Sequence, residues 1–177
     1  MLTEIPTADR LLEAHAGNIG RDFAAYRNHV YRVVNLCAAM LPVDAAGLDK
    51  IAIAAAFHDM GIWTDRTFDY LQPSIRLAEA HLARSGNAVW SAEIAAMILE
   101  HHKLSPYRGT RFHLVEPFRR ADWIDVSKGL RRFGLQRNVV REIFAAWPNA
   151  GFHRRLVQLS LQRWRSHPLS PLPMFRL

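Results

Sequence analysis

Apolar residues recur along this chain at steps of three and four, the spacing of an α-helix with one buried face. No segment alternates apolar and polar residues convincingly, as a half-buried strand would. In residues 20–41 the apolar positions are Phe23, Tyr26, Val30, Val33, Cys37 and Leu41. The same spacing predicts further helices over residues 44–59, 73–85, 88–103, 116–134, 138–147 and 152–166. An all-α fold is therefore expected.

Glycine and proline mark where the predicted helices stop. The pair Gly86-Asn87 is typical of one helix ending and the next being capped, and Pro106 and Pro148 interrupt the periodic pattern. No repeat, low-complexity tract or linker divides the 177 residues. Because a chain of this length can bury a substantial core, we expect a single domain over residues 1–177.

The distribution of apolar residues and cysteine indicates where the protein resides. The longest apolar run, IAIAAAF, is much shorter than the roughly 20 residues that span a bilayer. The N-terminus lacks the basic-then-apolar layout of a signal peptide, and the chain has one cysteine. We expect a cytoplasmic protein without a membrane partner. The sequence leaves its oligomeric state open.

Charge is distributed unevenly between the two parts of the chain. The net charge is +7. Residues 1–102 hold 8 basic and 12 acidic side chains, and residues 103–177 hold 15 and 4. A basic C-terminal part can be an ordinary solvated surface, or it can attract an anionic substrate or a nucleic acid. No recognised nucleic-acid motif accompanies it, so that partner stays open.

Six histidine and aspartate residues border the predicted apolar stripes, where they would face the core. They are His29, His58, Asp59, His81, His101 and Asp122. Nitrogen and oxygen donors of this kind suit Fe, Mn, Zn, Ni or Co, and a single cysteine cannot form a thiolate cage. Each residue alone could instead be a hydrogen-bonded core histidine or a helix-capping aspartate. As a set they predict a metal site.

The order of these residues resembles the HD superfamily of metal-dependent phosphohydrolases over residues 20–135. The matching segments are YRNHVYRV, FHDMG and RRADWIDVS. His81 and the histidine pair in ILEHHKL resemble the added ligands of the binuclear branch, which includes HD-GYP phosphodiesterases and mixed-valent di-iron oxygenases. The GYP signature is missing from SPYRGTRF, Ala25 stands where trinuclear sites carry Glu, and Trp63 stands where Lys often follows the HD element. These departures argue against cyclic di-GMP hydrolysis and a third metal.

The resemblance implies an HD-type helical bundle with C-terminal helices over residues 138–166 packed on the motif core. It implies two divalent metal ions. The first is held by His29, His58, Asp59 and Asp122. Asp59 bridges to the second, which His81 and His101 hold. His102 is either a further ligand or faces the substrate, and Asp125 is a candidate acceptor for a ligand histidine, or a surface residue.

The implied activity is hydrolysis of a small phosphoester or nucleotide by a metal-activated water. Asp59, His102 and Lys103 are the expected catalytic residues, and the expected phosphate-binding cations are Arg66, Lys103 and Lys128. Trp63, Phe68 and Tyr70 would hold a flat group or pack in the core. The alternatives are a di-iron oxygenase that needs both His81 and His101, another HD-type hydrolase or hydratase, and a non-catalytic nucleotide-binding scaffold.

Overall fold

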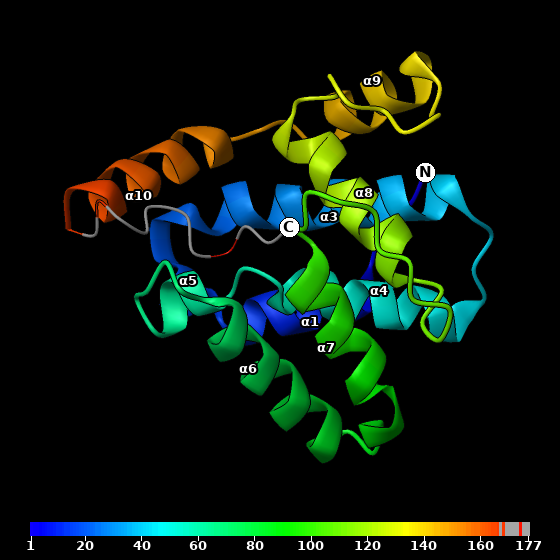
Figure 1. Cartoon of the computed structure of the whole chain (residues 1–177), viewed down its shortest axis with the longest axis horizontal. Helices are drawn as coiled ribbons and strands as arrows, with labels where there is room; N and C mark the ends of the chain where they lie inside the picture. The colour runs from blue at the N-terminus through cyan, green and yellow to red at the C-terminus, as the bar shows by residue number, and fades with distance from the viewer. Residues whose placement is uncertain (167, 169–173, 175–177) are drawn as a thin grey trace.

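The computed structural model describes residues 1–166, 168 and 174. Within these residues the protein is all-helical and has no strand, which confirms the predicted fold class (Figure 1). The longer helices are α1 (Pro6–Ala14), α3 (Phe23–Met40), α4 (Ala45–Phe57), α6 (Leu71–Arg84), α7 (Ser91–Glu100), α8 (Val115–Val126), α9 (Arg137–Ala146) and α10 (Phe152–Ser166). The shorter ones are α2 (Ala16–Ile19), η1 (Gly20–Asp22), α5 (Gly61–Thr64) and η2 (Ala88–Trp90).

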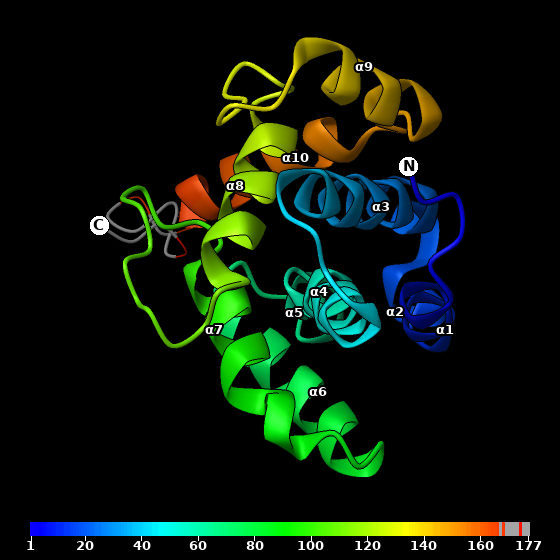
Figure 2. The same cartoon turned by 90° about the vertical axis from the view of Figure 1, so that its right-hand side faces the viewer.

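Helix α4 lies at the centre of the bundle, in contact with α1, α3, α6 and α7 (Figure 2). Residues 51–57 are all buried, because a helix that is apolar all round must be covered on every side. Asp44 caps its N-terminus by accepting a hydrogen bond from the Gly47 amide at 2.7 Å. The helix ends at Phe57, so His58 and Asp59 follow inside the core. Neither α4 nor any other described helix is long and apolar enough to cross a membrane.

The predicted helix end at Gly86 agrees with the structure, whereas the predicted end of the helix over residues 116–134 does not. Gly86 has a positive φ of 76° and separates α6 from α7, as expected. The helix predicted over 116–134 ends instead at Val126, because Lys128 and Gly129 adopt left-handed backbone conformations (φ 52° and 76°). The Gly129 amide then donates to the carbonyl of Ile124, which closes the helix. Helix α1, which begins at Pro6, was not predicted.

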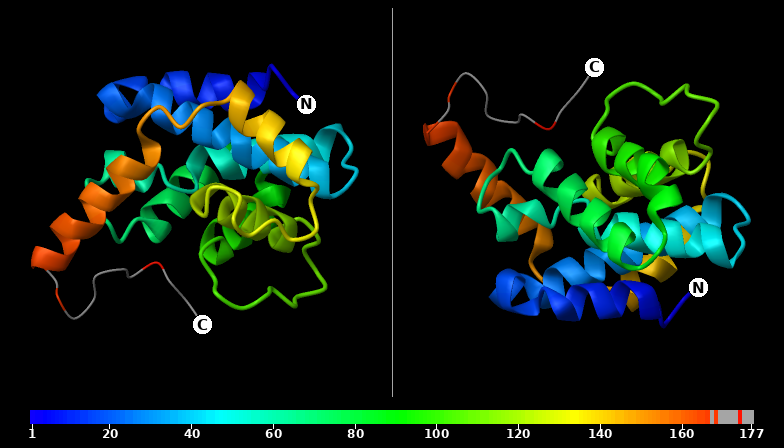
Figure 3. Two further views of the ribbon diagram at one scale, coloured as in Figure 1. Left: turned by 90° about the horizontal axis from the view of Figure 1, so that it is seen from above. Right: turned by 90° about the horizontal axis from the view of Figure 1, so that it is seen from below.

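Helices α9 and α10 both contact α3, the helix that carries His29. Figure 3 shows α10 running along one side of the bundle, beside the loop that follows α5. Its only buried residue is Phe152, the first of the helix, whose ring stacks on that of His29 at 4.0 Å between centroids. The C-terminal helices therefore reach the part of the core where the candidate metal ligands lie.

Gly61 should not tolerate a side chain. A Cβ atom there would lie 2.7 Å from the Tyr70 carbonyl oxygen and 2.8 Å from Cβ of Pro73. Gly61→Ala should therefore lower the free energy of unfolding by about 1–3 kcal/mol through overpacking, as measured by urea denaturation. Gly17→Ala is the matched control, since the position is helical and exposed with no atom within 4 Å. Equal stability of both variants would contradict this packing.

Candidate metal centre

His58 and His101 both stand directly after the last residue of a buried helix. Nδ1 of His58 donates to the carbonyl of Ala55 at 2.8 Å, and Nδ1 of His101 donates to the carbonyl of Ile98 at 2.6 Å. A carbonyl oxygen can only accept, so in each neutral ring Nδ1 holds the hydrogen and Nε2 carries the free lone pair. The ends of α4 and α7 thus fix both tautomers in the form that binds a metal through Nε2.

His29 is held in the same tautomer by a carboxylate. Its Nδ1 lies 2.5 Å from Oδ2 of Asp125, and Arg32 Nε lies 2.5 Å from Oδ1 of the same side chain. All three residues are fully buried. Burial raises the pKa of Asp125, but the hydrogen bonds and charges of His29 and Arg32 outweigh it and lower that pKa to about 2. Asp125 is therefore an ionised acceptor for the histidine, one of the two roles considered for it.

The Nε2 atoms of His29 and His58 face one another at 2.9 Å. At this distance the two lone pairs would repel, so either a proton held between the nitrogens or a bound metal ion must lie there. Asp59 Oδ2 lies 3.7 Å from the first of these nitrogens and 3.3 Å from the second. Asp122 Oδ1 lies 3.6 and 3.8 Å from them. His29, His58 and Asp59 thus bring their ligand atoms within 4.8 Å of one another, and Asp122 on α8 lies beside the two imidazoles without belonging to that compact group.

His29, His58 and Asp59 fit a divalent metal ion, and Asp122 lies next to them. With metal–ligand bonds of about 2.0–2.1 Å, neighbouring ligand atoms are spaced about 3.0 Å at right angles and about 3.4 Å in a tetrahedron. The distances among these atoms, those to Asp122 Oδ1 included, span 2.9–3.8 Å. The buried atoms without a hydrogen-bond partner include Asp59 Oδ1, His101 Nε2 and both carboxylate oxygens of Asp122. Burying such atoms unpaired is costly, and a bound cation would satisfy them.

A second group of donors lies on the other side of Asp59. Asp59 Oδ1 is 3.5 Å from His101 Nε2, and Asp122 Oδ2 is 3.5 Å from His102 Nδ1. Asp59, His101 and His102 offer ligand atoms that all lie within 4.8 Å of one another, as do those of His29, His58 and Asp59. The two oxygens of Asp59 therefore face separate donor groups, an arrangement suited to a carboxylate that bridges two cations.

The two carboxylates differ in how the surrounding charges act on them. Burial raises the pKa of Asp59, but the charge and hydrogen bonding of His58 and His101 hold it well below its ordinary value. Burial raises the pKa of Asp122, and the charge of Asp59 adds to this effect against the opposing histidines. For His58, burial lowers the pKa, but both carboxylates raise it to about 9. Without a metal ion, His58 therefore favours its positively charged form beside the two carboxylates. A bound metal ion would supply that positive charge in place of the proton.

His81 does not join the cluster, contrary to the expectation that it holds a second metal. Helix α6 buries Ala78 and Leu82, whereas His81 is half-buried with its ring 5.8 Å from that of Phe57, and it belongs to neither donor group. Burial lowers the pKa of His81, and the charges of Arg84 and Arg10 lower it further. Because Phe57 and His58 point in directions about 100° apart, a side chain that packs on the first is directed away from the second.

The three cations expected to bind phosphate are not brought together. Lys103 forms an ion pair with Glu100 at 3.3 Å. Lys128 is exposed in the turn after α8. The pKa of His153 is lowered mainly by burial, and the charge of Lys128 lowers it further. Arg66 is exposed in the loop after α5 and lines a cavity that none of the cluster residues line.

Trp63 lies in α5, and Phe68 and Tyr70 lie in the loop that follows it; the Phe68 ring lies 6.0 Å from that of Tyr70. Tyr70 is hydrogen-bonded through its hydroxyl to Nε2 of His102 at 2.7 Å. The Trp63 ring packs on that of Tyr26 at 4.5 Å, and Tyr26 in turn lies 6.2 Å from the rings of His29 and His58. Neither Tyr26 nor Arg32 was among the predicted site residues. A charged residue three positions after His29, within an apolar stripe, is the signal that could have identified Arg32.

Comparison of the chain with protein-family models, with curated protein sequences and with solved structures gave no match. The assignment of the cluster therefore rests on its residues and their geometry.

Metal content should separate His101 from His81. His101→Ala removes a donor of the second group, so we expect the number of metal ions per chain, measured by elemental analysis, to fall. His81→Ala is the matched control on α6 and should keep the full metal content, because its ring packs on Phe57 outside the cluster. Loss of metal in His81→Ala with retention in His101→Ala would contradict the site described.

Asp125→Asn should affect both stability and metal binding. We expect the free energy of unfolding to fall by about 3–5 kcal/mol, because Arg32 would keep a buried charge without a counter-ion. Metal affinity should fall about 10–100-fold, because His29 loses the charged acceptor that orients it. Urea denaturation and metal titration measure the two effects.

The double variant Arg32→Met with Asp125→Asn tests whether the two effects are separate. Neither buried charge is then left unpaired, so part of the stability should return while metal affinity stays low. Recovery of both properties together would mean that Asp125 does not position His29.

Proposed function

We propose that this chain is an HD-type, metal-dependent phosphohydrolase that acts on a small phosphoester or nucleotide through a metal-activated water. The observation that carries the proposal is the approach of His29 Nε2 and His58 Nε2 to 2.9 Å, beside buried carboxylate oxygens without partners. The order of these residues along the chain, which resembles the HD superfamily, supports the same assignment.

Divalent cations bound by this cluster would supply a nucleophilic water at neutral pH and would neutralise charge on a phosphoryl group. The protein's own residues set where this chemistry takes place. The side chains of His102 and Asp59 are 12% and 5% exposed, whereas those of His29 and His58 are fully buried. A substrate would therefore reach the cluster at the edge formed by His102 and Asp59.

His102 is well placed to handle a proton at this edge. Burial, together with the charge of the neighbouring His101, holds its pKa well below the ordinary value, so its ring is neutral. One ring nitrogen is hydrogen-bonded to Tyr70, and the other faces Asp122. A neutral imidazole here can act as a ligand or accept a proton from the attacking water. Lys103, the next residue, is the predicted phosphate-binding cation closest in sequence to the cluster.

A protein nucleophile is the main alternative to an activated water, and Cys37 is the one thiol available. It is fully buried in α3, and burial raises its pKa to about 12. A thiol of this kind holds its proton at neutral pH and is a poor nucleophile. This favours direct attack by water over a covalent intermediate.

A mixed-valent di-iron oxygenase is the second candidate, favoured by the second donor group at Asp59, His101 and His102. The resemblance that suggested this activity required His81 as a ligand. The position of His81 outside the cluster therefore supports the hydrolase over the oxygenase.

The proposal is tested with protein purified without oxygen and without chelators. We expect up to two metal ions per chain by elemental analysis, and release of inorganic phosphate from a panel of nucleotides and phosphomonoesters. Asp59→Asn should abolish metal binding. It should also reduce hydrolysis more strongly than the loss of a residue that only orients a metal ligand, which typically costs about 10–100-fold. Asp65→Asn, a change in the exposed loop after α5, is the control and should retain both. Consumption of O₂ without phosphate release would favour the oxygenase.

A further inference from the structure

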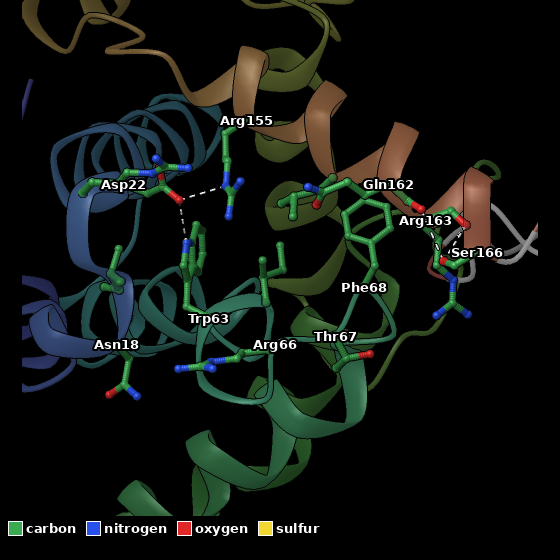
Figure 4. A pocket seen from close by; sticks show the side chains of 14 residues that line it. Asn18, Asp22, Trp63, Arg66, Thr67, Phe68, Arg155, Gln162, Arg163 and Ser166 are labelled. Atoms are coloured by element: carbon green, nitrogen blue, oxygen red, sulfur yellow. Dashed lines mark hydrogen bonds and ion pairs between the residues drawn. The ribbon is translucent and has the colours of Figure 1, made fainter.

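A cavity of about 700 Å³ lies between α10 and the segments around η1 and α5 (Figure 4). Its volume is within the range of about 300–1,000 Å³ typical of small-molecule sites. One wall is formed by α10, from Arg155 to Ser166, and the opposite wall by α5 and the loop after it, which carry Trp63, Arg66 and Phe68. The proposed hydrolysis does not use this cavity, because none of the cluster residues lines it.

The charged residues of the cavity give it a strong positive excess. The charged side chains that line it are Arg21, Asp22, Arg66, Arg155 and Arg163, a net charge of +3. The single carboxylate is already engaged, since it accepts from Trp63 Nε1 at 3.0 Å and faces Arg155 Nε at 2.9 Å. Arg21 and Arg66 form no ion pair or hydrogen bond with another described residue. Their guanidinium groups are available to an anion.

The rest of the lining is apolar and partly aromatic. Trp63 and Phe68 are joined by the aliphatic side chains of Ile19, Ile62 and Leu159. Arginine pairs with phosphate through two parallel hydrogen bonds, and aromatic rings stack against flat groups. A lining that combines the two suits a ligand with an anionic end and a planar ring.

The buried ring of Tyr26 lies next to both the cavity wall and the metal cluster. Trp63 in the cavity wall packs on the ring of Tyr26 at 4.5 Å, and that ring lies 6.2 Å from the rings of His29 and His58. None of the cluster residues lines the cavity. A ligand held there would therefore not contact the metal ligands.

We infer that this cavity is a binding site, separate from the metal centre, for an organic phosphate that carries a planar ring. The phosphate pairs with Arg21 and Arg66, and the ring lies against Trp63 and Phe68. This inference does not depend on the proposed hydrolase activity.

Adenosine 5′-monophosphate is the probe, titrated into metal-loaded protein by isothermal calorimetry. We expect saturable binding that is at least tenfold tighter than that of adenosine or of inorganic phosphate, because each of these offers half of the recognised chemistry. The double variant Arg21→Glu with Arg66→Glu should weaken binding at least tenfold. Arg141→Glu, an exposed arginine on α9 outside the cavity, is the control and should leave the affinity unchanged.

The Asp59→Asn variant separates this inference from the proposed function. It should bind the probe as tightly as the original protein, because none of the cluster residues lines the cavity. Loss of binding in Asp59→Asn, or unchanged affinity in the double arginine variant, would place the nucleotide at the metal centre and overturn the inference. Equal affinity for inorganic phosphate would also overturn it, since the ring would then contribute nothing.

Discussion

The buried carboxylate of Asp125 binds both the guanidinium of Arg32 and the imidazole of His29. The fold and the candidate metal centre both depend on this carboxylate. It accepts from Arg32 on both oxygens and from His29 on Oδ2. A buried guanidinium is tolerated only with a partner, so α3 and α8 must pack with these residues in register. Arg32 also donates to the carbonyls of Trp147 and Pro148, which anchors the connection between α9 and α10. The contact that orients His29 is thus part of the framework that joins four helices.

His58 and His101 are held in the same tautomer as His29, but by backbone carbonyls instead of a partner side chain. Each follows the end of a helix and donates to the carbonyl three residues earlier, one of the groups that a helix end leaves unsatisfied. The backbone therefore supplies the acceptor, and no partner side chain is needed. For this to work the helix ends must be buried, which explains why the apolar α4, covered on every side, leads into the His58-Asp59 pair.

The fold class could be predicted from the sequence because a helix buries a stripe of fixed period, and that period is visible along the whole chain. Periodicity places a residue on a buried face without stating which neighbour that face meets. His81 borders its stripe as expected, yet the side of α6 that carries it meets Phe57 rather than the cluster. The helix over 116–134 was predicted too long because the left-handed turn at Lys128 and Gly129 was overlooked, although the glycine was a visible signal. Whether two stripes meet depends on tertiary packing, which one sequence does not display.

The aromatic residues around the cluster determine how it can meet a substrate. Phe152 covers His29 on one side, and Tyr26, backed by Trp63, covers His29 and His58 on another. Such an enclosure excludes water and strengthens the electrostatic interactions inside it. The arginines of the cavity line a space that none of the cluster residues line. Charge on a phosphoester at the metal centre would have to be met by the cations themselves and by residues at the edge near His102.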